Sequence, residues 1–387
     1  MRTLTLTDAP ALGRLLARGA FLSPCKSLRL PRESALRGAG TGPRPGTATR
    51  LVLPGVRIDL ARLAAYERVC GFPTGEDAVP LTYPHVLGFP LAMRIMAGRD
   101  FPLPLLGLVH TSIEITRRRR LPATGEYEIT VYVDGLAPHR RGTEATVVTE
   151  VRDGCEDAAG LAWESRSTYL ARHRRSEDAH ARRSEDARTG GRAEAHASGS
   201  EDGPAEDGRA GGSEDRRAED RRAEDGRARG SEDRRAEDRR AEDGRAGGSE
   251  DGRADARERA REERKALPTV AEWRLAGDVG RRYGAVSGDR NPIHLHPLGA
   301  RLFGFPRPIA HGMWTVARCL AEHGTPPATL VRAEFRAPVP LPGAVTYIAD
   351  GQAWGGFELR SGDAPGPGGE QVRSRVHVRG HVYPLAA

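Results

Sequence analysis

Two side chains that can exchange protons, Asp289 and His294, lie five residues apart in the sequence. Asn291-Pro292 separates them, and the residue before a proline is driven out of the helical region of backbone conformation. We therefore predict an extended turn that aims the carboxylate and the imidazole at one point. General acid–base chemistry on a small substrate or a water molecule requires such a pair. An isolated Asp in this setting would more often only cap a turn.

The elements that must position this pair fall into two halves of similar layout. Each half is predicted to hold a helix, a second and more apolar helix, and then several strands, with clear period-two alternation at residues 126–133 and 372–378. In the first half the predicted helices are 60–69 and 84–96, and the predicted strands are 108–116, 125–136, 143–152 and 159–171. In the second half the predicted helices are 279–287 and 312–322, and the predicted strands are 330–338, 344–354, 356–360 and 372–382.

Local matches between the halves indicate an ancient duplication. Tyr66 and Gly71 have the same spacing as Tyr283 and Gly288. The predicted fold class is α+β, with one long helix wrapped by an antiparallel sheet, twice. The predicted boundaries are 51–175 for the first half and 265–387 for the second.

A charged segment, residues 176–264, separates the halves. It consists almost entirely of Ser, Glu, Asp, Arg, Ala and Gly, and an 18-residue unit begins again at Ser213, Ser231 and Ser249. With almost no large apolar side chains it cannot bury enough surface to offset the entropy lost on ordering, so we predict disorder. Residues 1–50 are rich in Arg, Ser and Pro; we expect an N-terminal arm or a disordered lead rather than a transit peptide, because the Ala/Gly/Arg-rich character persists along the chain.

Composition limits the cell compartments and the classes of ligand that we expect for this protein. The four cysteines are scattered without a Cys-x-x-Cys pair, which predicts no disulfide framework, no zinc site and a cytoplasmic protein. No run of about 18 apolar residues occurs, so no membrane span is expected. The basic excess lacks the motifs of nucleic-acid binding, and the arginine run 117–120 is interpreted as a solvated strand edge or a phosphate contact. A net positive folded body suits a ligand with several phosphates.

The segment from Tyr283 to Met313, with Ser-Gly-Asp-x-Asn-Pro-x-His followed by Ala-His-Gly-Met, resembles the signature of MaoC-like (R)-specific enoyl hydratases, also called 3-hydroxyacyl-thioester dehydratases. Val79-Pro-Leu-Thr-Tyr-Pro-His85 and Asp100-Phe-Pro102 are similar to the tandem members of that family. The resemblance covers residues 52–172 and 266–385 and implies a double hot-dog fold.

Carried onto this chain, the resemblance implies that Asp289 and His294 form the acid–base pair and that Asn291 orients substrate or water. Gly312 matches the glycine whose backbone N–H polarises the thioester carbonyl. Physical reasoning supports that last role, because Gly312 begins an apolar helix whose first N–H groups are unpaired and lie at the positive end of its dipole. The implied reaction is reversible hydration of a trans-2-enoyl thioester to the (3R)-hydroxyacyl thioester. The implied partner is an acyl-CoA or acyl-carrier-protein thioester, with no separate cofactor and no metal.

In the first half, alignment on Tyr66 and Gly71 places Phe72 where Asp289 lies in the second, and no Asn-Pro-x-His follows. The family pattern then implies a non-catalytic half that supplies the wall and tunnel for the acyl chain. Apolar residues within 87–96 are interpreted mainly as core, with a share in shaping that tunnel.

Several alternatives remain open at the level of sequence. His296 and His311 are interpreted as structural, and Ser287 as a hydrogen-bonding loop residue, since no nucleophile elbow surrounds it. A hot-dog acyl thioesterase is a second function, and a non-enzymatic acyl-thioester-binding or assembly protein is a third. A homodimer of the tandem unit is compatible with the sequence.

Overall fold

The computed structural model describes residues 2–13, 15, 23, 49–154, 160–172, 267–361 and 374–386, which belong to one compact unit. The insert predicted to be disordered, residues 176–264, lies outside these ranges. Most of the predicted N-terminal arm or lead also lies outside them, although its first residues form an edge strand. Among the described residues, no helix has the length and apolar character needed to cross a membrane.

Each half presents the same succession of elements. The first half contains β1 (Arg2–Thr5), β2 (Thr49–Arg57), α3 (Leu60–Cys70), α4 (Tyr83–Met96), β3 (Leu108–Arg117), β4 (Glu126–His139), β5 (Gly142–Asp153) and β6 (Leu161–Arg172). The second half contains β7 (Thr269–Leu275), α7 (Val279–Ser287), α8 (Pro292–Leu295), α9 (Pro297–Leu302), α10 (Gly312–His323), β8 (Thr329–Phe335), β9 (Gly343–Ala349), β10 (Gly355–Ser361) and β11 (Val376–Pro384).

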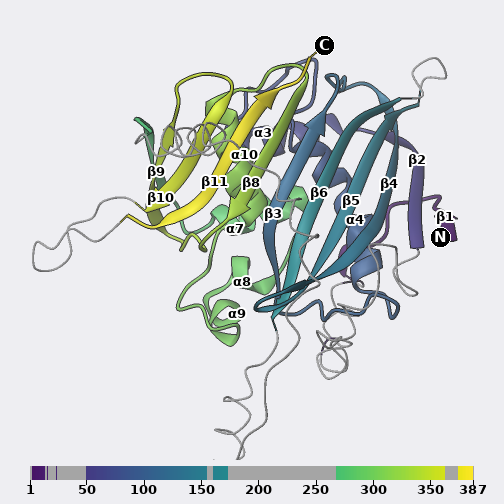
Figure 1. The fold of residues 1–387 in the computed structure, drawn as a ribbon, viewed down its shortest axis with the longest axis horizontal. Helices are drawn as coiled ribbons and strands as arrows, with labels where there is room; N and C mark the ends of the chain where they lie inside the picture. The colour runs from purple at the N-terminus through teal and green to yellow at the C-terminus, as the bar shows by residue number, and fades with distance from the viewer. Residues whose placement is uncertain are drawn as a thin grey trace, which may run out of the picture. The chain divides into compact units, whose positions relative to one another are not determined.

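The described strands form one continuous sheet of eleven, in the order β1-β2-β4-β5-β6-β3-β8-β11-β10-β9-β7. From edge to centre, the order β2-β4-β5-β6-β3 of the first half corresponds to β7-β9-β10-β11-β8 of the second. The halves join where β3 pairs with β8 antiparallel, from Ser112 opposite Glu334 to Arg117 opposite Thr329. Figure 1 shows these two strands side by side at the middle of the sheet.

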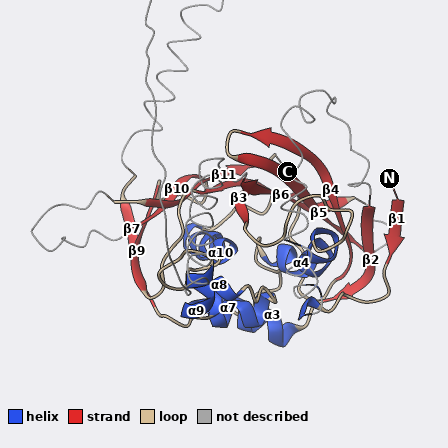
Figure 2. Ribbon diagram, turned by 90° about the horizontal axis from the view of Figure 1, so that it is seen from below, coloured by secondary structure: helices blue, strands red, loops and turns tan. Residues whose placement is uncertain are grey.

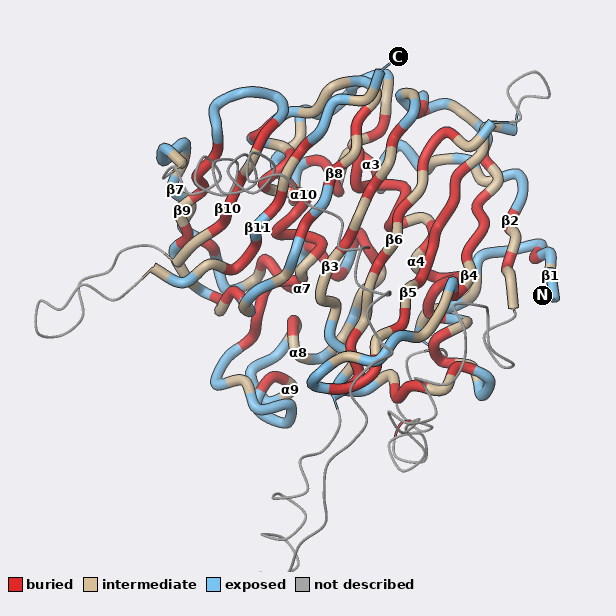
Figure 3. Tube along the Cα trace, in the orientation of Figure 1, coloured by how far each residue is buried: buried red, intermediate tan, exposed pale blue. Residues whose placement is uncertain are grey.

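The helices lie on one face of the curved sheet, with α4 and α10 beneath the strands of their own halves (Figure 2). Buried residues follow the central strands and these helices, whereas exposed residues gather at the turns (Figure 3). The two halves also meet through α3 and α7, where the rings of Tyr66 and Tyr283 lie 6.0 Å apart. The predicted α+β architecture of two helix-on-sheet halves is confirmed.

The predicted helices and the four main strands of each half are present, with shifts at their ends. β2 and β7, the edge-side strands of the two halves, were not predicted from the sequence. Pro54-Gly55 interrupts the strand pattern there, and a bulge between Leu53 and Val56 accommodates it within β2. The prediction for Asn291-Pro292 needs refinement, because Asn291 is extended but Pro292 begins the short helix α8.

The interpretation of Arg117 as a solvated edge or phosphate contact was wrong. Its side chain is buried on β3, and its guanidinium donates hydrogen bonds to the carbonyls of Pro326 and Pro327 and to the hydroxyl of Thr325. These acceptors belong to the loop between α10 and β8, so one arginine of the first half holds a loop of the second.

We expect Arg117→Met to lower the free energy of unfolding by about 3 kcal/mol, because it leaves buried carbonyls without their charged donor. Urea denaturation followed by circular dichroism measures this change. Arg118→Met is the matched control, since Arg118 is exposed one residue further on, and it should change stability by less than about 0.5 kcal/mol. Equal effects of the two substitutions would contradict the assignment.

Candidate active site

The loop after α7 is shaped by a chain of local hydrogen bonds. Helix α7 ends at Gly288, which adopts the left-handed conformation with φ 82°. The Ser287 hydroxyl accepts a hydrogen bond from the Asp289 amide at 3.2 Å, which confirms its predicted place within the loop. The Asp289 carboxylate accepts one from the Asn291 amide at 3.2 Å, and this bond fixes where the carboxylate points.

The Asn291 side chain hydrogen-bonds to the backbone of its own loop. Its side-chain oxygen accepts a hydrogen bond from the Ile293 amide at 3.3 Å and so caps the N-terminus of α8. The cap and Pro292 start the helical turn that carries His294. A direct contact of Asn291 with substrate or water stays a prediction.

His294 is buried on α8, and its Nδ1 lies 2.8 Å from the carbonyl oxygen of Ile309. A carbonyl can only accept, so Nδ1 carries the hydrogen. Burial lowers the pKa of His294, although the Asp289 carboxylate acts in the opposite sense. The ring is therefore neutral near pH 7, and its Nε2 presents a lone pair that can accept a proton.

His311 also hydrogen-bonds to the loop that carries Asp289. Its Nε2 donates to the backbone carbonyl of Asp289 at 2.9 Å and lies 3.9 Å from the Asp289 carboxylate. Its ring stacks on His294 with centroids 3.7 Å apart. Burial and the neighbouring His294 lower the pKa of His311 to about 3. The predicted packing or hydrogen bonding of His311 near the helix start is confirmed, and the carbonyl that it bonds is that of Asp289.

The carboxylate and the imidazole predicted to converge do so. One ligand-type atom each of Asp289, His294 and His311 lies within 4.8 Å of the others. These are donor types that can also hold a metal ion, but His294 Nδ1 and His311 Nε2 are already bonded to backbone carbonyls. Only the remaining ring nitrogens and the carboxylate could bind a metal ion. That the protein uses no metal stays a prediction.

Gly312 is the first residue of α10, directly after His311. Its N–H is one of the first amides of a helix, which have no partner within the helix, and it lies at the positive end of the helix dipole. A side chain at this position would bring a Cβ to 2.9 Å from the ring of Phe335 on β8. Glycine is therefore required for the close approach of α10 to the sheet beside the acid–base pair.

The first half contributes side chains that the sequence analysis left without a role. The Asp289 carboxylate acts to raise the pKa of His85 on α4 and of Tyr169 on β6, which places both rings within its field. His85 lies in the motif that suggested the family, but nothing in that motif indicates a contact with the other half. Phe72 follows the cap Gly71 as Asp289 follows Gly288, and its ring stacks on Tyr66.

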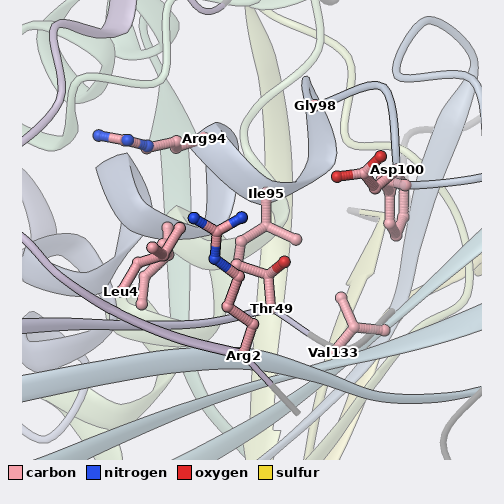
Figure 4. A pocket seen from close by; sticks show the side chains of 10 residues that line it. Arg2, Leu4, Thr49, Arg94, Ile95, Gly98, Asp100 and Val133 are labelled. Carbon is pink, nitrogen blue, oxygen red and sulfur yellow. The ribbon is translucent and has the colours of Figure 1, made fainter. Parts of the chain in front are cut away.

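A separate hollow of about 150 Å³ lies under β1, lined by β1, β2, the last turn of α4 and the loop after it (Figure 4). Arg94 and Ile95 on its wall are about ten residues along α4 from His85, roughly 15 Å at 1.5 Å per residue. This hollow therefore lies apart from the acid–base pair.

Comparison with known proteins agrees with this geometry. A family model described as "MaoC like domain" matches residues 257–349. A 3-hydroxyacyl-thioester dehydratase X from Mycobacterium tuberculosis is 31% identical over 305 residues, which are 78% of this chain and 80% of that protein. The crystal structure of HtdX from the same organism superposes with a TM-score of 0.56 at 26% identity, covering 87% of this chain and 100% of that one. A MaoC-like dehydratase from Phytophthora capsici shares the fold, with a TM-score of 0.51 at 14% identity over 86% of this chain and 94% of that one.

The buried imidazoles predict a steep acid dependence of stability. Burial lowers the pKa of His85 to about 4, and of His110 and His311 to about 3, from the ordinary value of 6.5. Between about pH 6 and 4.5 the unfolded chain therefore binds up to three more protons than the folded protein. Stability should fall as the pH falls through this window, by up to about 4 kcal/mol per pH unit.

Urea denaturation at pH 7, 6 and 5 measures this slope. His85→Phe should reduce it by about 1.4 kcal/mol per pH unit, the contribution of one proton. A slope that is the same in this variant would show that the His85 ring is not kept neutral by the fold.

Proposed function

The chain belongs to the MaoC-like dehydratase family, and from that premise we propose that it reversibly hydrates trans-2-enoyl thioesters to (3R)-hydroxyacyl thioesters. The family makes it a hydro-lyase of acyl-thioester metabolism, with the tandem hot-dog fold. The observation that supports the finer assignment is the convergence of the Asp289 carboxylate with the His294 imidazole, whose Nδ1 is bonded to the Ile309 carbonyl and whose Nε2 is left to accept a proton. That nitrogen is a base at neutral pH because the Ile309 carbonyl holds the ring hydrogen on Nδ1.

In the hydration direction, a water lies between the Asp289 carboxylate and His294 Nε2. As its oxygen attacks C3, one proton passes to His294 Nε2, and the Asp289 carboxylate stabilises the imidazolium that forms. A proton from the same assembly is then delivered to C2, so the elements of one water molecule are added across the double bond. General acid–base catalysis of this kind contributes about 10²- to 10⁴-fold.

Negative charge develops on the thioester oxygen while C3 is attacked. The Gly312 N–H donates to this oxygen, and the positive end of α10 adds to the stabilisation. We assign the site to residues 265–387 and the acyl wall to residues 51–175, where Phe72 replaces the carboxylate. The acyl group is carried on CoA or on the phosphopantetheine of a carrier protein. The cytoplasmic location and a homodimer of the tandem unit stay predictions.

We expect Asp289→Asn and His294→Ala each to lower kcat for hydration of crotonyl-CoA by about 10²-fold or more, because each removes a proton-transfer group. Loss of enoyl absorbance without release of free thiol identifies hydration, whereas thiol release would favour the thioesterase. Asp278→Asn is the control, since this acid at the start of α7 makes no side-chain capping bond. Near wild-type rates in both folded variants would overturn the assignment.

Gly312→Ala should lower both stability and kcat. The added Cβ meets the Phe335 ring at 2.9 Å, and overpacking of this kind costs about 1–3 kcal/mol. Combining it with Phe335→Leu should restore much of the melting temperature. If kcat recovers as fully as stability does, Gly312 matters for packing alone and not through its amide.

A further inference from the structure

Three imidazoles lie near Asp289 and a fourth stacks on one of them, and two of these four rings come from the first half. His294 and His311 belong to the loop and helix start already described. His85, on the first turn of α4, is 8% exposed and lies within the field of the Asp289 carboxylate. His110, on β3, stacks on His85 with ring centroids 6.2 Å apart and planes at 13°.

A continuous series of rings connects these two histidines to Gly312. His110 packs against Tyr169 at 4.5 Å and against Phe335 at 4.7 Å between ring centroids. Phe335 is the ring that a Cβ at Gly312 would touch. His110 is thus one ring away from Gly312 and His85 is two rings away, while the Asp289 carboxylate acts on the pKa of His85.

Both first-half histidines keep a buried ring nitrogen without a partner. Within the described part of the chain, His85 Nδ1 and His110 Nε2 make no hydrogen bond, although each atom is shielded from solvent. His294 differs, since its Nδ1 is used by the Ile309 carbonyl. His311 Nδ1 and His323 Nε2 are also buried without a partner in the described residues, so an unpaired nitrogen alone does not indicate a ligand. Burying such an atom is unfavourable, and beside the acid–base pair a polar group of the substrate is an available partner.

The chemistry of the two rings limits what that partner can be. Burial keeps both imidazoles uncharged at neutral pH, so they suit an uncharged polar group better than a phosphate or carboxylate. A plain alkyl tail would leave both nitrogens unpaired. The polar groups of the substrate nearest the reacting carbons are the thioester carbonyl and the oxygen on C3.

We propose that His85, supported by His110, hydrogen-bonds the polar head of the acyl thioester, so that the non-catalytic half supplies a substrate-binding residue to the active site. This inference rests on the proposed hydratase function and adds a residue to it. The site is then composite: one half supplies the proton-transfer groups and the other supplies a neutral contact that orients the head of the substrate.

Three substitutions at His85 test which atom matters. His85→Phe keeps a ring but removes both nitrogens, His85→Asn places an amide where Nδ1 stood, and His85→Gln places one nearer Nε2. We expect kcat/KM for crotonyl-CoA to fall about 10- to 100-fold in the Phe and Gln variants, the effect of losing one hydrogen bond to substrate, and to stay within about 5-fold of wild type for Asn. A merely structural role would give no rescue specific to Asn.

His323→Phe is the matched control. His323 is buried at the end of α10, its Nδ1 is bonded to the Tyr347 hydroxyl at 2.8 Å, and its Nε2 has no partner in the described part of the chain. It is thus a similar histidine on the other half, and its loss should leave kcat/KM within about 3-fold. Wild-type kcat/KM in His85→Phe, or equal losses in the Phe and Asn variants, would overturn the proposal.

A binding measurement identifies which oxygen of the substrate His85 contacts, and it does not depend on turnover. In the Asp289→Asn background, calorimetry compares butyryl-CoA, (3R)-3-hydroxybutyryl-CoA and free CoA, with and without His85→Phe. Weaker binding of the hydroxyacyl ligand alone assigns the 3-oxygen, and equal weakening of both acyl ligands assigns the carbonyl. Unchanged binding of both, or weaker binding of free CoA, would reject the contact. Absence of hydration by the wild type would instead reject the proposed function.

Discussion

The antiparallel pairing of β3 with β8 is the constraint on which the rest of the structure depends. It joins two helix-on-sheet halves into one sheet, and the buried Arg117 on β3 adds hydrogen bonds to the loop that leads into β8. Because of this pairing, His110 on β3 packs against Phe335 on β8, and Phe335 in turn packs against the start of α10. The site near α10 therefore includes side chains from both halves.

Burial then decides the chemical state of the site. The rings of His294 and His311 are buried, so both are neutral near pH 7, and each carries its hydrogen where a backbone carbonyl accepts it. The Asp289 carboxylate, whose side chain is 29% exposed, supplies the negative charge in this set. The same burial that keeps His294 neutral, and so able to accept a proton, is expected to cost stability in acid.

The duplicated halves have diverged in a complementary way. Gly71 and Gly288 end equivalent helices in the same left-handed conformation, but Phe72 packs on Tyr66 where Asp289 turns toward His294. In the proposal made above, the copy without the carboxylate still contributes His85, which lies at the start of its apolar helix within the field of Asp289. An active site assembled from two unequal copies can separate proton transfer from substrate orientation.

The sequence alone determined the four longer helices, most of the strands and the pairing of Asp289 with His294, and it indicated the duplication, because period-two and helical patterns and the Asn-Pro turn act over a few neighbouring residues. The short helices α8 and α9 were not predicted. Nor was β2, whose Pro54-Gly55 is accommodated by a bulge against β4, and Arg117, whose partners lie about 210 residues away, was misinterpreted. Likewise, only the tertiary structure revealed His85 and His110, and the tautomers of His294 and His311. Those features depend on contacts between segments far apart in the chain, where burial and the position of a single carbonyl decide what a side chain does.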